Sequence, residues 1–262
     1  MKRRKFIQTT AAATALTATG LQAGASTRQQ QAMANNEYYE FRVYLMKRGG
    51  GLNRLTKYLS DALIPALNRY GCKNVGVFKE MADPEPTKIY MVIPYISMEH
   101  FAGVGEFLSS DEAYRTAEME YQKIPQENTV YERFDTYLLR AFDAVPQMFI
   151  PEKKERIFEL RTYQGYSEDA VRRKVKMFND GEIPIFNATG LHPVFFGHII
   201  SGPDMPALTY MIQFKDIAER EANWKAFLEH PDWKKMSAME EYANTVSNII
   251  RVFLLPLEIS QV

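Results

Sequence analysis

Two short segments of the chain alternate a carboxylate, a guanidinium and a phenol along one side of an extended backbone. In Glu40–Tyr44 and again in Glu159–Tyr163, every second residue is Glu, then Arg, then Tyr. Side chains two residues apart on a strand share a face, so each triplet forms one polar row. A guanidinium offers five fixed donors that match a carboxylate, and the phenol adds a hydroxyl. The candidate ligand-binding residues in these rows are Glu40, Arg42, Tyr44, Glu159, Arg161 and Tyr163.

The same two rows also have a purely structural interpretation. Buried charges are paired whether or not a ligand is present, and a Glu and an Arg on one strand face can neutralise each other. The intervening side chains, such as Phe41 and Leu160, are mostly apolar, and we expect them to pack against helices. Ligand pocket and self-neutralised ion pair both remain open at this point.

Two histidines are further candidates for the site. His192 and His198 lie six residues apart on an expected strand, with Phe196 between them, and even spacing places both on one side. Either could act as a general base or a metal or haem ligand. Six residues of strand span roughly 20 Å, too far for both to bind one metal. The alternative is two ordinary surface histidines.

Other catalytic signatures are missing from the sequence. There is no G-x-G-x-x-G, P-loop, H-E-x-x-H or G-x-S-x-G motif. The single cysteine, Cys72, has no signature around it and no second cysteine to pair with. The sequence therefore predicts no metal site and identifies no catalytic residue.

The polar rows belong to a longer repeat. The second row follows the first by 159 − 40 = 119 residues, and Ile64-Pro65 recurs as Ile183-Pro184 at the same offset. Tyr90-Met91 aligns with Tyr210-Met211, and Phe107-Leu108 with Phe227-Leu228, one residue further on. This period is too long for a solenoid repeat and fits a duplicated small domain.

Each half predicts the order strand, helix, strand, strand, helix, strand. That order is typical of a ferredoxin-like unit, an antiparallel sheet with helices on one face. We expect the two uncovered sheet faces to pack together as an α+β barrel, with both polar rows pointing into it. Pro65 should interrupt or kink the first helix of the first half, and the corresponding helix of the second half, expected to run to about Thr189, contains Pro184. The expected domains are residues 37–145 and 156–262, joined by a linker at 146–155.

The repeated motifs resemble one known family. The E-[FL]-R-x-Y opening, the I-P-x-x-N-x-x-G helix end and the late F-L…W segment are similar to those of NIPSNAP proteins. The resemblance covers both halves as tandem domains and is stronger in the second, which holds Trp224 and Trp233. It implies a fold of the dimeric α+β barrel superfamily, but it does not define a reaction.

The N-terminus predicts an export signal. Arg3 and Arg4 precede a weakly apolar run, and small residues end at Ala25, so residues 1–25 resemble a Tat signal peptide recognised by the Tat export machinery. Residues 26–36 are polar and predict a flexible lead-in, and the apolar run is too short for a membrane span. Removing the signal leaves a charge of 28 − 32 = −4, a poor match to nucleic acid. The expected location is periplasmic or extracellular.

Three functions follow from this reading. The first is binding of a small polar or carboxylate-bearing ligand in a pocket between the two sheets. The second is an enzyme using that pocket, because α+β barrels related to the resembled family include monooxygenases and haem-dependent oxidoreductases. The third is a structural or interaction module, and a homo-oligomer is compatible with all three. No cofactor is expected, with haem as the alternative.

Overall fold

A computed structural model describes residues 36–48 and 51–262. The expected signal at 1–25 and most of the lead-in at 26–36 lie outside the described residues. No helix in the described part of the chain is both long and apolar enough to cross a membrane.

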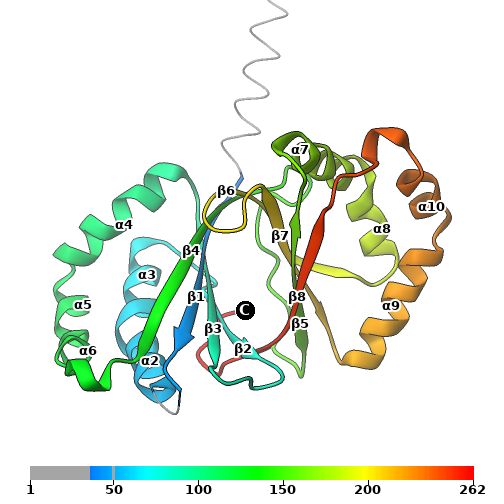
Figure 1. The fold of residues 1–262 in the computed structure, drawn as a ribbon. Coiled ribbons are helices and arrows are strands. Elements are labelled where there is room, and N and C mark those ends of the chain that lie inside the picture. The colour runs from blue at the N-terminus through cyan, green and yellow to red at the C-terminus, as the bar shows by residue number, and fades with distance from the viewer. Residues whose placement is uncertain (1–35, 49–50) are drawn as a thin grey trace, which may run out of the picture. The chain divides into compact units, whose positions relative to one another are not determined.

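Eight antiparallel strands close into one barrel (Figure 1). The order around it is β1-β3-β2-β8-β5-β7-β6-β4, so each half supplies four consecutive strands. The halves join where β4 pairs with β6 and where β2 pairs with β8. This is the expected α+β barrel of two βαββαβ units. The strands are β1 (Tyr38–Met46), β2 (Gly76–Glu80), β3 (Lys88–Tyr95), β4 (Tyr131–Ala141), β5 (Ile157–Gln164), β6 (His192–Ser201), β7 (Ala207–Phe214) and β8 (Asn248–Pro256).

Helices cover the outer face of the barrel on two sides, one side for each half (Figure 1). The helices of the first half are α2 (Leu52–Tyr58), η1 (Leu59–Leu63), α3 (Ile64–Tyr70), α4 (Met98–Ser110), α5 (Glu112–Ala117), α6 (Met119–Gln122) and η2 (Gln126–Asn128). Those of the second half are α7 (Glu168–Met177), η3 (Phe178–Glu182), α8 (Ile183–Ala188), α9 (Ile217–Glu229), α10 (Pro231–Ser237) and η4 (Glu240–Tyr242).

The prolines do not stop the first helix of either half. Instead, a π-helical turn precedes each Ile-Pro pair, at Leu59–Leu63 and at Phe178–Glu182, and helical backbone continues beyond it. Proline has no amide proton to donate to the preceding turn, and a wider turn accommodates that missing bond. The helix ends as expected in the first half, where Gly71 adopts φ +110° after Tyr70.

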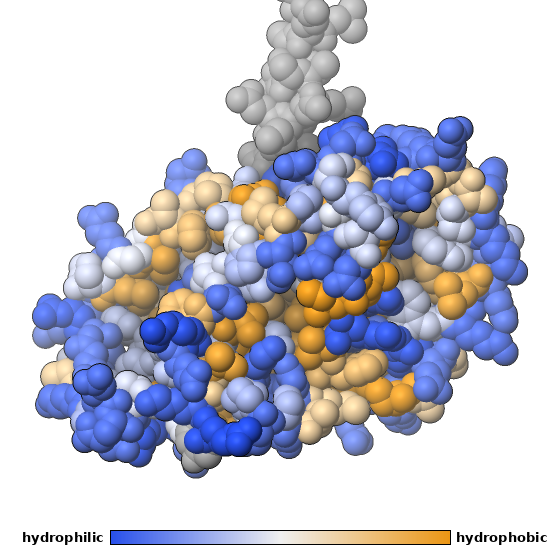
Figure 2. All heavy atoms as spheres, in the orientation of Figure 1, coloured by the Kyte–Doolittle hydropathy of each residue, from blue (hydrophilic) through white to orange (hydrophobic). Residues whose placement is uncertain are grey.

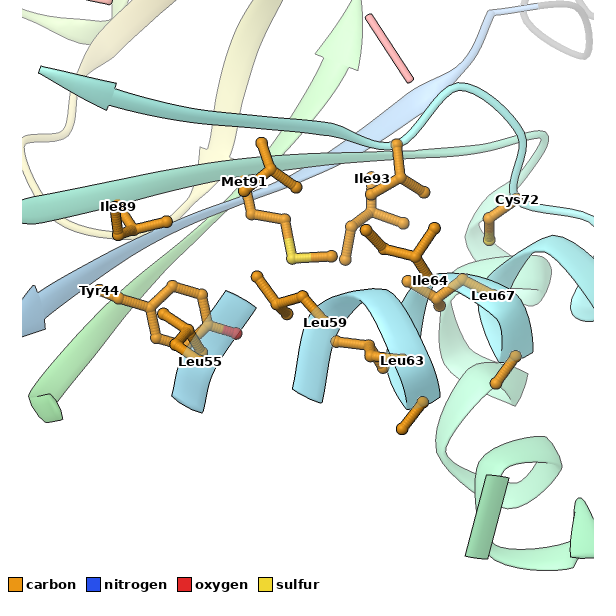
Figure 3. Packing of buried hydrophobic residues seen from close by; sticks show 14 of the residues in the cluster. Tyr44, Leu55, Leu59, Leu63, Ile64, Leu67, Cys72, Ile89, Met91 and Ile93 are labelled. Atoms are coloured by element: carbon orange, nitrogen blue, oxygen red, sulfur yellow. The ribbon is translucent and has the colours of Figure 1, made fainter. Parts of the chain in front are cut away.

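The expected orientation of the polar rows is wrong. The barrel interior is filled by apolar side chains of both halves, among them Tyr39, Phe41, Phe158 and Leu160. Tyr44 points the other way, toward Leu55 and the helices (Figure 3). The rows with Glu40, Arg42 and Tyr44, and with Glu159, Arg161 and Tyr163, therefore lie between sheet and helices. Strand alternation separates two faces but does not identify the inner one when both are buried.

The pairing of β1 with β3 and of β5 with β7 corresponds at one offset, where the sequence indicated two. Arg42 pairs with Met91, and Arg161 pairs with Tyr210. The structural equivalent of Tyr210 is thus Met91, 119 residues earlier, and Tyr90 faces the barrel interior instead. The aligned Tyr-Met pairs in the sequence were one residue out of register.

Candidate functional site

The candidate site lies between the sheet of the second half and its helices, and we call it the second-half cluster. It combines side chains from β5, the α7–η3 helix, β7 and the α9–α10 helices. Ionisable groups here are surrounded by aromatic rings instead of water. The members are Glu159, Arg161, Tyr163, Lys174, Glu182, Tyr210, Arg220, Trp224 and Trp233.

Glu159 is the fully buried centre of the cluster. Arg220 donates to both of its oxygens, from Nε at 3.0 Å and Nη2 at 3.1 Å. Trp224 donates its indole N–H to Oε2 at 2.8 Å. Both donors come from α9, one turn apart, so this helix is fixed to the sheet through a single carboxylate.

Arg161 has weaker polar contacts than its neighbour. Its Nη1 lies 3.8 Å from Glu159 Oε1, and its Nε is buried without a hydrogen-bond partner. The guanidinium lies 4.3 Å from the Trp224 ring centroid and 5.4 Å from that of Tyr163. Burial lowers the pKa of Arg161, but facing tyrosines and carboxylates outweigh this effect and leave the pKa raised. The group stays cationic with one donor unused.

A second ion pair lies beside it. Lys174 Nζ is 2.6 Å from Glu182 Oε2, and both side chains are almost fully buried. Burial raises the pKa of Glu182, against the opposing pull of Lys174. The Tyr163 and Tyr210 hydroxyls bond to each other at 2.9 Å, and burial raises the pKa of both. Two neutral phenols therefore face the charged groups.

The charges of the cluster do not balance. Arg161, Lys174 and Arg220 supply three cations, whereas Glu159 and Glu182 supply two carboxylates. The excess positive charge falls on Arg161, whose contact with Glu159 is the longest. A largely buried cation with a free donor, whose carboxylate partner is distant and shared with Arg220, is suited to bind an anion.

The first half builds a simpler version of this site. Arg42 Nε bonds to Glu40 at 2.5 Å, and Tyr95 donates to the other oxygen of Glu40 at 3.0 Å. Here one cation meets one carboxylate. At the 119-residue offset, Leu55 and Leu63 stand in place of Lys174 and Glu182, and both leucines are buried. Tyr44 remains near the cluster, with Arg42 Nη1 at 3.5 Å.

The two candidate histidines lie apart from both clusters. A β-bulge between Pro193 and Phe195 changes the strand parity, so His192 and His198 do not share a face as expected. His192 is exposed and lines a surface cavity of about 530 Å³. His198 is half-buried, and burial together with Arg140 lowers its pKa.

Neither cluster supplies a free histidine as the axial ligand of a haem. The second-half cluster contains no histidine, and His100, which is near Tyr95, has both ring nitrogens in backbone contacts, with Ile96 and Tyr70. Within residues 36–48 and 51–262, no three His, Cys, Asp or Glu side chains are grouped to hold a metal ion.

Lys174, Glu182 and Arg220 are the residues that the sequence reading missed. A signal for Arg220 existed, because it lies four residues before Trp224 and so shares its helix face. A signal for Lys174 and Glu182 also existed, since they replace leucines at the repeat offset. Neither signal could be used without knowing that the polar rows face the helices.

Comparison with known proteins adds a family and a fold. Residues 158–261 match the model of the NIPSNAP family. No curated protein sequence matches the chain. A NIPSNAP-like domain protein from Burkholderia xenovorans covers 40% of this chain and 89% of its own, at 18% identity and a TM-score of 0.37.

Two solved structures match nearly the whole chain. A monooxygenase-like protein from Fusobacterium nucleatum covers 86% of this chain and 94% of its own, at 10% identity and a TM-score of 0.56. A monooxygenase-like protein from Lactobacillus acidophilus covers 85% of this chain and 94% of its own, at 9% identity and a TM-score of 0.54. At such identities the likeness concerns the fold alone. The second half of the chain therefore matches the NIPSNAP family, within an α+β barrel that monooxygenase-like proteins share.

Proposed function

We propose that the protein binds a small carboxylate-bearing ligand in the second-half cluster. The observation that carries this proposal is Arg161, a largely buried guanidinium with a buried, unpaired Nε in a cluster of three cations and two carboxylates. A ligand carboxylate would balance the charge and accept from the free donor. This moves the proposed pocket from between the sheets to the layer between sheet and helices.

The first half supports this proposal as an internal control. It forms the same sheet–helix layer with Leu55 and Leu63 where the second half has Lys174 and Glu182. The fold therefore does not require the buried ion pair. Buried pairs contribute little to stability compared with apolar residues of similar size, so a role in binding accounts better for their presence.

The surroundings favour a ligand with a flat apolar part. The rings of Tyr163, Tyr210 and Trp224 border Arg161, and Trp233 packs beside Lys174. Apart from the contacts of Arg220 and Trp224 with Glu159, α9 has one buried side chain, Phe227, and α10 has none. Displacement of these two helices would open the cluster to solvent.

Calorimetric titration with benzoate tests the proposal. Benzoate combines a carboxylate with a flat ring, and wild-type protein should bind it with a 1:1 stoichiometry. Arg161→Gln should abolish the heat of binding, because it removes the cationic anchor. Arg42→Gln, the matched change in the first half, should leave binding unchanged. Equal loss in both variants, or no binding of benzoate, would reject the assignment.

An enzyme with this fold is the second candidate. The observation that favours it is the likeness to monooxygenase-like proteins over 85–86% of the chain. In that case the phenols of Tyr163 and Tyr210 are the groups placed to hold a proton near a bound substrate. A visible absorption spectrum of protein purified from its host distinguishes a haem enzyme from a cofactor-free one, since a Soret band would indicate haem.

We further propose that the protein is exported through the Tat machinery. Arg3 and Arg4 support this proposal by sequence alone. Replacing both with lysine should retain the unprocessed chain inside the cell, as seen by fractionation and immunoblotting. Normal processing of that variant would point to another export route.

A further inference from the structure

We propose that the first part of β4 is an interface at which a second copy of this chain pairs edge to edge. Strand β4 bonds to β1 from Tyr131 to Arg140. On its other edge, β6 begins to pair only at Leu138. Among the described residues, no strand covers that edge between Tyr131 and Tyr137. The backbone edge from Arg133 to Asp135 is thus free to extend a sheet. It lies between a bulge at Glu132 and the turn at Gly202, which approaches Thr136 and Tyr137.

The side chains of the same segment are at least partly exposed on both faces. Glu132, Arg133, Phe134 and Asp135 are consecutive and all exposed, with Phe134 at 44%. Phe134 lies on the helix-facing side of the sheet, where part of its ring packs against Tyr44, with the two ring centroids 5.2 Å apart, and the rest stays exposed. The surface over β4 and β8 shows hydrophobic side chains among hydrophilic ones (Figure 2). An exposed phenylalanine on an open edge indicates a contact surface.

The segment is complementary to itself. In an antiparallel pair centred on Phe134, Arg133 stands opposite Asp135 of the second copy, and Asp135 stands opposite its Arg133. The two Phe134 rings meet on the other face. Opposite charges directly across two strands stabilise their pairing, whereas edges that avoid pairing carry like charges, lysines or prolines. A two-fold axis at Phe134 satisfies both charge pairs at once.

The other open strand edge of the barrel, on β8, is not complementary to itself. Strand β8 pairs with β2 only from Leu254 onward and exposes Asn248, Ile249, Ile250 and Arg251. Arg251 has no acidic residue at a symmetry-related position of that segment. Self-pairing there would leave the charge uncompensated, so the β4 edge is the one that fits a second copy.

Sedimentation velocity of the full-length protein over a dilution series tests this interface. Wild type should form a dimer. Arg133→Asp and Asp135→Arg each place like charges opposite each other twice, and each should weaken the dimer by on the order of tenfold or more. The double variant R133D/D135R restores opposite charges and should restore the dimer. A monomer at all concentrations, or a dimer that ignores the single changes, would overturn the proposal.

Disulfide trapping provides the second measurement. Residues directly opposite in an antiparallel pair have Cα atoms about 4.5–5.5 Å apart, which suits a disulfide. Phe134→Cys should therefore give a covalent dimer on mild oxidation. Ser109→Cys, exposed on α4, should not, and the native Cys72 is buried. A dimer that is trapped by a cysteine at Ile249 but not at Phe134 would assign the contact to β8 and contradict the β4 interface.

Discussion

At the scale of single residues, Glu159 was predicted as a candidate site residue, but its main hydrogen-bond partner was not predicted. The sequence identified Glu159 and Arg161 as neighbours on one strand face, and they are. However, the strong partner of Glu159 is Arg220, which is 61 residues away on α9. A strand pattern holds no information about which helix will cover it, so that contact could not be predicted.

The first prediction concerns this carboxylate. Arg220→Ala removes both guanidinium donors and leaves Glu159 buried with the Trp224 indole and a distant Arg161. We expect a loss of about 3–5 kcal/mol in the free energy of unfolding, measured by chemical denaturation. Arg161→Ala should cost less, because its contact with Glu159 is 3.8 Å long. Arg172→Ala, on an exposed side chain, is the control. A larger loss for Arg161→Ala than for Arg220→Ala would refute the geometry.

The second prediction is a pH dependence at His198. Burial and Arg140 lower the pKa of this imidazole from 6.5. Below pH 6.5 the unfolded chain takes up a proton that the folded protein does not, so stability is full above pH 6.5 and falls on acidification. His198→Gln should remove this part of the decline between pH 6.5 and pH 5, measured by urea denaturation. Parallel curves for the two proteins would show that His198 has an ordinary pKa.

At the scale of elements, the order and type of strands and helices could be predicted because each has a clear period and clear end signals. Ser167, a residue type favoured at the start of a helix, caps α7 by accepting from Ala170 N at 3.2 Å. The π-helical turns could not be predicted, since the pattern of apolar residues only indicated a break near each proline. The bulge in β6 was equally hidden, because it depends on pairing with β7.

The third prediction compares two glycines at helices of the first half. Gly51 precedes α2 with φ +93°, and an added Cβ would lie 2.3 Å from the Val130 carbonyl oxygen. Gly105 lies within α4 with nothing near its added Cβ. Gly51→Ala should destabilise by at least about 1–2 kcal/mol. Gly105→Ala should stabilise by about 0.5–1 kcal/mol.

Thermal unfolding monitored by circular dichroism measures both glycine changes. The two variants carry the same chemical change, so any difference reports on backbone conformation and space alone. The account of the α2 start would be wrong if Gly51→Ala melted at or above the wild-type temperature.

At the scale of the whole molecule, the barrel depends on both halves. Its interior is built from apolar rows of the two sheets, with Phe41 and Phe78 of the first half and Phe158 and Phe195 of the second. The 119-residue repeat allowed this architecture to be predicted, since each half predicts a sheet with one uncovered face. The repeat did not reveal that the apolar rows, and not the polar ones, meet inside.

The fourth prediction follows from that interior. Residues 37–145 expressed alone would expose the apolar row of β1 and β3, so this fragment should be recovered as a dimer or an aggregate. Light scattering of the fragment measures this directly. A stable, soluble monomer would show that the first half does not need the second to cover its sheet.

The most direct test of the central claim uses the intrinsic tryptophan fluorescence. The chain has two tryptophans, and both Trp224 and Trp233 belong to the second-half cluster. Benzoate binding beside Arg161 should change the emission of wild type and of Arg42→Gln in a saturable manner, and Arg161→Gln should show no saturable change. Saturable binding that leaves the emission unchanged, or an equal response in Arg161→Gln, would contradict a ligand site between sheet and helices.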